Sequence, residues 1–198
     1  MSNMIQALIF DCFGVLITDA FQSLITEVRV NDPELGARLL ALTAASDHGT
    51  LGTDEAARQA AALLGMGFAA LRQKVAAGEV KSQAMLDFAG SFRPKYKTAV
   101  LSNVSVNGLE RRFARGELGR YFDVVVASGE IGSAKPEAQA YEIVAQRLGV
   151  RLNECVMIDD RAEYCAGAEA VGMRSVQFQT LEQLQRDLKQ LLNASRAE

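Results

Sequence analysis

The chain has 198 residues, of which 49% are hydrophobic and 23% are charged. This composition is typical of a globular protein with a full hydrophobic core, and the length suits one large domain or a core domain with a modest insertion. Lysine and arginine number 21 and aspartate and glutamate 24, so the net charge is −3. We therefore expect neither nucleic acid nor a membrane as a partner, because no strong positive field, polybasic run or bilayer-spanning apolar stretch is present.

The three cysteines, Cys12, Cys155 and Cys165, are odd in number and lack the spacing of metal ligands. This pattern favours buried thiols in a reducing compartment. The first residues also lack the basic segment, long apolar run and small-residue cleavage site of a signal peptide. We therefore expect a cytoplasmic protein.

The first predicted element is a strand at residues 5–10, an apolar run that ends at Asp11. From about residue 16 to residue 88 the pattern changes, because apolar residues recur at helical spacing and no strand-like run interrupts them. Helices of this segment are expected to begin near Pro33, Thr53, Phe68 and Met85. We therefore predict a purely helical insertion after the first strand.

Strand-like and helical patterns alternate from about residue 98 to the end of the chain. The later apolar runs, which fit strands buried on both faces of a sheet, are 99–101, 124–127, 156–158 and 175–178. Between them, helices are predicted from Pro136 to a stop at Gly149 and from Arg161 to a stop at Gly172. A capping box at Thr180 opens the last helix.

This alternation predicts an α/β fold with a doubly wound parallel sheet and a small all-helical cap inserted after the first strand. Residues 1–15 and 89–198 would form the core domain, and residues 16–88 the cap domain.

Ligands of open parallel sheets bind at the carboxyl ends of the strands, where the strand order reverses. The polar residues that follow the predicted strands are Asp11, Ser102, Asn103, Asp159 and Asp160. Lys135 joins this set, because it precedes the proline at a predicted helix start and a helix N-terminus attracts anions.

Three carboxylates at one edge of a sheet repel one another. At an effective dielectric constant near 20, each close pair costs roughly 4 kcal/mol, and one lysine does not offset that sum. A hard dication with oxygen ligands does, and Mg²⁺ is the usual choice beside a phosphate. The residues alone thus predict a magnesium site next to a phosphate.

Four segments resemble the four motifs of the haloacid dehalogenase superfamily and occur in the family order. They are IFDCFGVLITD, AVLSN, GEIGSAKPEAQAYEIVAQRLGV and VMIDDRAEYCAGAEAVGM. The match covers essentially the whole predicted core. The helical insertion is similar to the small helical caps of the subfamily that includes haloacid dehalogenases and many phosphatases.

The resemblance implies a magnesium-dependent hydrolase. Asp11 would attack phosphorus in line and form an aspartyl phosphate. The ion would be held by the Asp11 carboxylate, the backbone carbonyl of Phe13 and Asp160, with Asp159 acting directly or through a bound water. The implied substrate is a small phosphorylated metabolite, either a phosphate ester or an acyl phosphate.

The resemblance also implies roles for the remaining site residues. Ser102 would donate a hydrogen bond to a phosphate oxygen. Lys135 would neutralise developing charge and orient Asp11. Asn103 would help to bind the phosphate through its side chain or its backbone.

The chain departs from the family pattern at Phe13. Phosphatases of the family carry a second aspartate at this position, which protonates the leaving group and later activates water, and such help is worth roughly 10²–10⁴-fold. Either the substrate has a good leaving group, or Asp19 or His48 supplies the proton, or turnover is slow. Tyr164 is a second departure, because many relatives have asparagine or aspartate there.

Three functions follow from these residues. The favoured function is a magnesium-dependent phosphatase. A metal-free 2-haloacid dehalogenase, in which Asp11 displaces halide from carbon, agrees with an aromatic residue at Phe13 but not with the Asp159–Asp160 pair. A catalytically weak binding or regulatory protein agrees only with the missing acid.

One further interpretation concerns a small basic cluster outside the motifs. Arg111, Arg112 and Arg115 follow one another closely in the sequence. Such a cluster is typical of the solvated face of a surface helix, so we expect no binding role for it.

Overall fold

The structure, a computed structural model, describes residues 4–47 and 49–197. Its centre is a five-stranded parallel sheet in the order β3-β2-β1-β4-β5. The strands are β1 (Ala7–Phe10), β2 (Lys97–Ser102), β3 (Val124–Ala127), β4 (Cys155–Asp159) and β5 (Arg174–Gln177). The predicted doubly wound α/β sheet is therefore confirmed, and the strand order reverses between β1 and β4.

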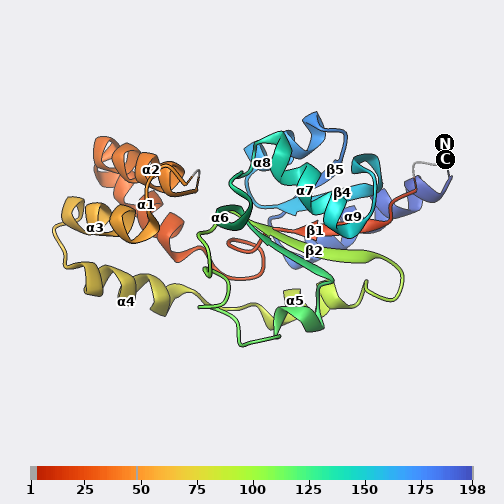
Figure 1. The fold of residues 1–198 in the computed structure, drawn as a ribbon, viewed down its shortest axis with the longest axis horizontal. Helices are drawn as coiled ribbons and strands as arrows, with labels where there is room; N and C mark the ends of the chain where they lie inside the picture. The colour runs from red at the N-terminus through yellow and green to blue at the C-terminus, as the bar shows by residue number, and fades with distance from the viewer. Residues whose placement is uncertain (1–3, 48, 198) are drawn as a thin grey trace.

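Each face of the sheet is covered by helices (Figure 1). The helices of the core that pack on the sheet are α5 (Gln83–Gly90), α7 (Ala138–Leu148), α8 (Ala162–Ala170) and α9 (Leu181–Ala197). Buried residues of α7 and α8 share one hydrophobic cluster with Ala7 and Ile9 of β1. Buried residues of α5 and α9 share the other cluster with Leu8 and Phe10. Alternate residues of β1 thus face opposite layers, as the pleat of a strand requires.

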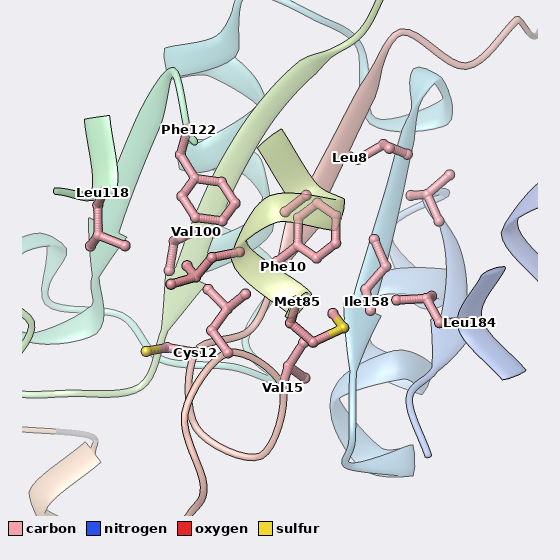
Figure 2. Close-up of a cluster of buried hydrophobic side chains, with 14 of the residues drawn as sticks. Leu8, Phe10, Cys12, Val15, Met85, Val100, Leu118, Phe122, Ile158 and Leu184 are labelled. Carbon is pink, nitrogen blue, oxygen red and sulfur yellow. The ribbon is translucent and has the colours of Figure 1, made fainter. Parts of the chain in front are cut away.

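Figure 2 shows part of the cluster that contains Leu8 and Phe10. Phe10, Ile158 and Val100, from three neighbouring strands, lie against Met85 and Leu184 from the covering helices. The ring of Phe10 packs against that of Phe122 with 5.9 Å between centroids. Close packing of this kind holds the carboxyl ends of β1, β2 and β4 in fixed positions relative to one another.

Four helices that follow β1 and precede β2 in the sequence form a separate group. They are α1 (Ala20–Asn31), α2 (Pro33–Asp47), α3 (Thr53–Leu63) and α4 (Phe68–Gly78), and we refer to them as the helical insertion. They pack around a hydrophobic cluster of their own, with Leu39 and Leu71 among its buried members. In Figure 1 they lie together at one end of the sheet, beyond α6 (Ser128–Ile131).

Side-chain caps explain where several of these helices begin. Asp19 accepts a hydrogen bond from the backbone N–H of Gln22 at the start of α1, at 2.9 Å. Thr180 accepts one from Gln183 at the start of α9, at 3.1 Å. Each cap satisfies a backbone N–H that has no partner within its helix.

The structure differs from the sequence-based expectation in the details of two helices. The helix predicted to begin at Pro136 begins at Ala138, because the Glu137 carboxylate accepts hydrogen bonds from Ser133 and from the backbone of Ala134 in a preceding turn. The helix near Met85 packs on the sheet and not within the helical insertion. The cap boundaries at residues 16 and 88 stay a prediction, and α5 lies outside the cluster of α1–α4.

Short 3₁₀ turns at Leu118–Arg120 and Leu152–Glu154 complete the described elements. Over the residues that the structure describes, no helix combines the length and the apolar character needed to cross a membrane.

The packing of α5 on the sheet gives a stability prediction. Leu86 is fully buried in the cluster that contains Leu8 and Phe10, so Leu86→Ala leaves a cavity and should lower the free energy of unfolding by about 2–5 kcal/mol. Val30 is 79% exposed, and Val30→Ala should change it by no more than about 0.5 kcal/mol. Urea denaturation of both variants measures the difference, and equal effects would contradict this packing.

Candidate active site

Two neighbouring strands bring their terminal aspartates together. Phe10 pairs in register with Ile158, and the backbone N–H of Asp11 donates to the Ile158 carbonyl at 2.8 Å. Asp11 therefore lies beside Asp159, and one carboxylate oxygen from each of Asp11, Asp159 and Asp160 lies within 4.8 Å of the others. The convergence of carboxylates expected from the sequence is present at the switch point of the sheet.

Lys135 lies within this cluster. Its ammonium donates to Asp11 Oδ1 and to Asp159 Oδ2, each at 2.6 Å, and its side chain is 0% exposed. The sequence places Lys135 beside a helix N-terminus as an anion site, whereas the structure buries the ammonium between two carboxylates. A buried charge requires such partners, because removing it from water is costly.

Asn103 holds the Lys135 segment in place. Its Oδ1 accepts from the backbone N–H of Lys135 at 2.8 Å, and its Nδ2 donates to the Lys135 carbonyl at 2.9 Å and to the Tyr164 hydroxyl at 3.2 Å. The ring of Tyr164 also lies under the Lys135 ammonium, 4.9 Å from the ring centroid. The resemblance implies phosphate binding by the side chain or the backbone of Asn103, and the structure shows its side chain engaged with Lys135 and Tyr164.

Burial and charge together shift the ionisation of this cluster. Burial raises the pKa of Asp11, Lys135 opposes that rise, and the charge of Asp159 adds to it. Burial and the charge of Asp159 raise the pKa of Asp160 to about 6. For Lys135, burial alone would lower the pKa, but the charges of Asp11 and Asp159 raise it above its ordinary value. Lys135 therefore stays protonated, and its single positive charge faces three carboxylates.

Two buried oxygens of the site lack a hydrogen-bond partner among the residues that the structure describes, Ser102 Oγ and Asp160 Oδ1. Unpaired buried polar atoms are uncommon in folded proteins and indicate a missing ligand or ion. Three carboxylates with one free oxygen form an oxygen donor set of the kind that Mg²⁺ prefers. The residues present therefore fit a magnesium ion.

Gly14 allows the loop after β1 to approach Asp160 closely. Its φ is +91°, and a Cβ built on it would lie 2.5 Å from the Asp160 carboxylate carbon. Only glycine fits here, because both the backbone conformation and the space exclude a side chain.

A matched pair of variants tests the role of this contact. Gly172 has the same φ of +91° with no atom near a Cβ, so Gly172→Ala should cost only the backbone term of about 1–2 kcal/mol. Gly14→Ala should cost more, because it displaces Asp160, and should reduce any rise in melting temperature on addition of Mg²⁺. Thermal denaturation with and without Mg²⁺ measures both effects. Equal behaviour of the two variants would show that Gly14 has no special contact with the site.

Phe13 lies at the edge of the cluster, next to a residue that the sequence did not single out for the site. The Arg112 guanidinium lies over the Phe13 ring at 4.8 Å and donates to both carboxylate oxygens of Glu79, at 2.6 and 2.8 Å. The Arg112 side chain is 24% exposed and residues 106–112 form turns, so its interpretation as part of a solvated helix face is wrong. Its partner Glu79 is distant in the sequence, which explains why no local pattern revealed the pair.

A cavity of about 380 Å³ connects the cluster with the helical insertion. Asp11, Phe13 and Tyr164 line it from the sheet side, and Asp19 lines it from the start of α1. Burial raises the pKa of Asp19. His48, the other residue considered as a proton donor, lies outside the described residues.

The fold places this chain among the doubly wound α/β proteins, whose ligand sites lie at the carboxyl ends of the strands. Acidic residues and a buried lysine occupy that position here. Residues 5–172 match the haloacid dehalogenase-like hydrolase family. The chain therefore belongs to this family, and the resemblance inferred from the four motifs is confirmed.

Individual relatives agree with this assignment. Phosphatase MT3486 of Mycobacterium tuberculosis (strain CDC 1551 / Oshkosh) is 37% identical over 100 residues, which cover 48% of this chain and 46% of that protein. The chain spans less than half the length of the first curated relatives that it matches, from 18% to 46%.

Solved structures share the fold. HAD family enzyme bt-2542 from Bacteroides thetaiotaomicron, in complex with magnesium and inorganic phosphate, has a TM-score of 0.69 and 20% identity, covering 91% of this chain and 98% of that one. L-2-haloacid dehalogenase from Xanthobacter autotrophicus, with chloropropionic acid covalently bound, has a TM-score of 0.66 and 22% identity, covering 94% and 83%. At these identities the likeness shows the fold.

Proposed function

We propose that this protein is a magnesium-dependent phosphatase that cleaves a small phosphorylated metabolite through an aspartyl phosphate on Asp11. The observation that carries the proposal is the convergence of Asp11, Asp159 and Asp160 around the buried Lys135. The phosphatase named among the relatives, and the neighbouring structure that holds magnesium and phosphate, support it.

The proposed metal ligands are the carboxylates of Asp11 and Asp160 and the backbone carbonyl of Phe13, with Asp159 bound directly or through water. When bound there, Mg²⁺ supplies positive charge to the phosphoryl oxygens and to the crowded carboxylates. Replacing Phe13 does not remove its ligand atom, because that atom belongs to the backbone.

Lys135 orients the proposed nucleophile. It holds Asp11 Oδ1 at 2.6 Å, which leaves Oδ2 to attack phosphorus. The new bond joins this oxygen to phosphorus while the bond from phosphorus to the leaving group breaks, and water later displaces the aspartyl oxygen. Because its pKa is raised, Lys135 keeps its proton and acts through charge. The buried hydroxyl of Ser102, which has no partner among the described residues, would donate to a phosphoryl oxygen.

The phenyl ring of Phe13 cannot protonate a leaving group. The proposed chemistry therefore favours substrates whose leaving groups depart without a proton, such as acyl or aryl phosphates. Asp19 lines the same cavity and is the carboxyl of the helical insertion that we propose as a source of partial acid help.

The dehalogenase alternative keeps one observation in its favour, the aromatic ring at Phe13 beside Asp11. Two further carboxylates at the site oppose it, because they repel an anionic haloacid when no metal is bound.

Replacing the proposed nucleophile tests the chemistry. Phosphate release from acetyl phosphate should require Mg²⁺, and Asp11→Asn should lower it by at least about 10³-fold, because the covalent route is lost. Asp87, exposed on α5, provides the matched control, and Asp87→Asn should leave the rate unchanged. Halide release from 2-chloropropionate that persists with a chelator would instead establish the dehalogenase, and a folded protein inactive in both assays would establish a non-catalytic role.

Restoring the absent acid is a second test. Phe13→Asp should raise the rate with poor leaving groups, such as alkyl phosphates, by up to about 10²-fold. Phe13→Asn introduces a side chain of the same size as aspartate but without a carboxyl, and should not raise this rate. Initial rates of the two variants are measured at saturating Mg²⁺, and both variants should show the same increase in melting temperature with Mg²⁺. A Phe13→Asp variant that binds Mg²⁺ and gains nothing would refute this account of Phe13.

A further inference from the structure

The far wall of the 380 Å³ cavity comes from the helical insertion, and apolar side chains make up about half of its lining residues. Each of its four helices contributes, and the apolar members of this wall are Phe21, Leu42, Ala56, Ala57, Ala60, Leu71, Val75 and Ala76. Apolar surface on a concave wall favours an apolar ligand, because both lose contact with water on binding.

The hollow exists because one helix presents small side chains to it. Ala56 and Ala60 are one turn apart on α3, and Ala57 lies beside them. Residues at this spacing share a helix face, so a face of methyl groups leaves room that larger side chains would fill. Phe21 and Val75 pack on the buried cluster of the insertion while remaining partly exposed.

Three of the four arginines that line the cavity form ion pairs. Arg72 pairs with Asp54 at 3.6 Å, Arg112 pairs with Glu79, and Arg161 pairs with Glu163. Arg111 donates to the Ser105 hydroxyl at 3.0 Å. Within the described residues, the wall thus lacks a cluster of uncommitted cations for a second phosphate or carboxylate of a substrate.

The hydroxyl groups of the wall are engaged in the same way. Thr43 donates to the Leu39 carbonyl at 3.1 Å, and Ser46 donates to the Thr53 hydroxyl at 3.3 Å. A sugar placed against this wall would meet hydroxyl groups whose protons are already donated, and each sugar hydroxyl left unpaired would carry a cost.

Resting on the proposed phosphatase function, we infer that the substrate is an aryl phosphomonoester whose leaving group carries an apolar body. The phosphoryl group lies at Asp11, and the apolar body occupies the hollow beside α3. A sugar phosphate is the competing substrate class, and the wall described above disfavours it.

Two aryl phosphates isolate this contribution. Phenyl phosphate and 4-butylphenyl phosphate release phenols of similar acidity, so the chemical step is matched and only apolar area differs. The butyl compound should have a kcat/KM at least about tenfold higher, because each buried methylene favours binding. Equal values for the two compounds, or faster turnover of glucose 6-phosphate than of either, would overturn the inference.

Filling the hollow gives the decisive comparison. Ala57→Phe should reduce the ratio of the two kcat/KM values to near one, and Ala57→Leu, a smaller change, should reduce it partly. Ala62, exposed on the same helix and outside the cavity wall, is the matched control, so Ala62→Phe should keep the full ratio. A ratio that survives in a folded Ala57→Phe variant would place the apolar body elsewhere and refute the proposal.

A binding measurement tests the apolar site independently of the proposed phosphatase activity. If no phosphate ester is cleaved, the phosphatase proposal fails, and calorimetry with non-hydrolysable 4-butylbenzylphosphonate and benzylphosphonate decides the inference alone. Tighter binding of the butyl compound with a more negative heat-capacity change would support the apolar site. Equal affinities would reject it.

Discussion

The buried ammonium of Lys135 is the interaction on which the site depends. It is held by two carboxylates at 2.6 Å, and its removal would leave those buried carboxylates uncompensated. The dependence is mutual, because a lysine without these carboxylates would lose its proton in such surroundings. Asn103 fixes the backbone of this residue from the end of β2. The site is therefore a single electrostatic unit and not a set of independent side chains.

The topology of the sheet makes this unit possible. β1 lies at the centre between β2 and β4, so residues that follow three strands meet although Asp11 and Lys135 are separated by 124 positions. Tight packing beneath the strand ends keeps their spacing fixed, which an electrostatic unit of short contacts requires. The helical insertion enters the chain directly after the first of these residues and forms the opposite wall of the cavity.

Much of this arrangement follows from local sequence. Apolar runs ending in polar residues located the five strands and the carboxylate cluster, because strand burial and the switch point are general features of parallel sheets. Partners brought by tertiary packing were not predictable. Arg112 forms an ion pair with Glu79 at the cavity wall, and the Asn103 side chain forms hydrogen bonds with the backbone of Lys135. The helix near Met85 has an apolar face that suits either layer, so its place on the sheet depends on the whole fold.

The helical insertion and the sheet have separate hydrophobic clusters. Substitutions in residues that share no contacts have nearly additive effects on stability. Changes in the lining of α3 therefore leave the energetics of the carboxylates almost untouched. Such a division lets mutation reshape the cavity wall without disturbing the geometry of the acidic cluster.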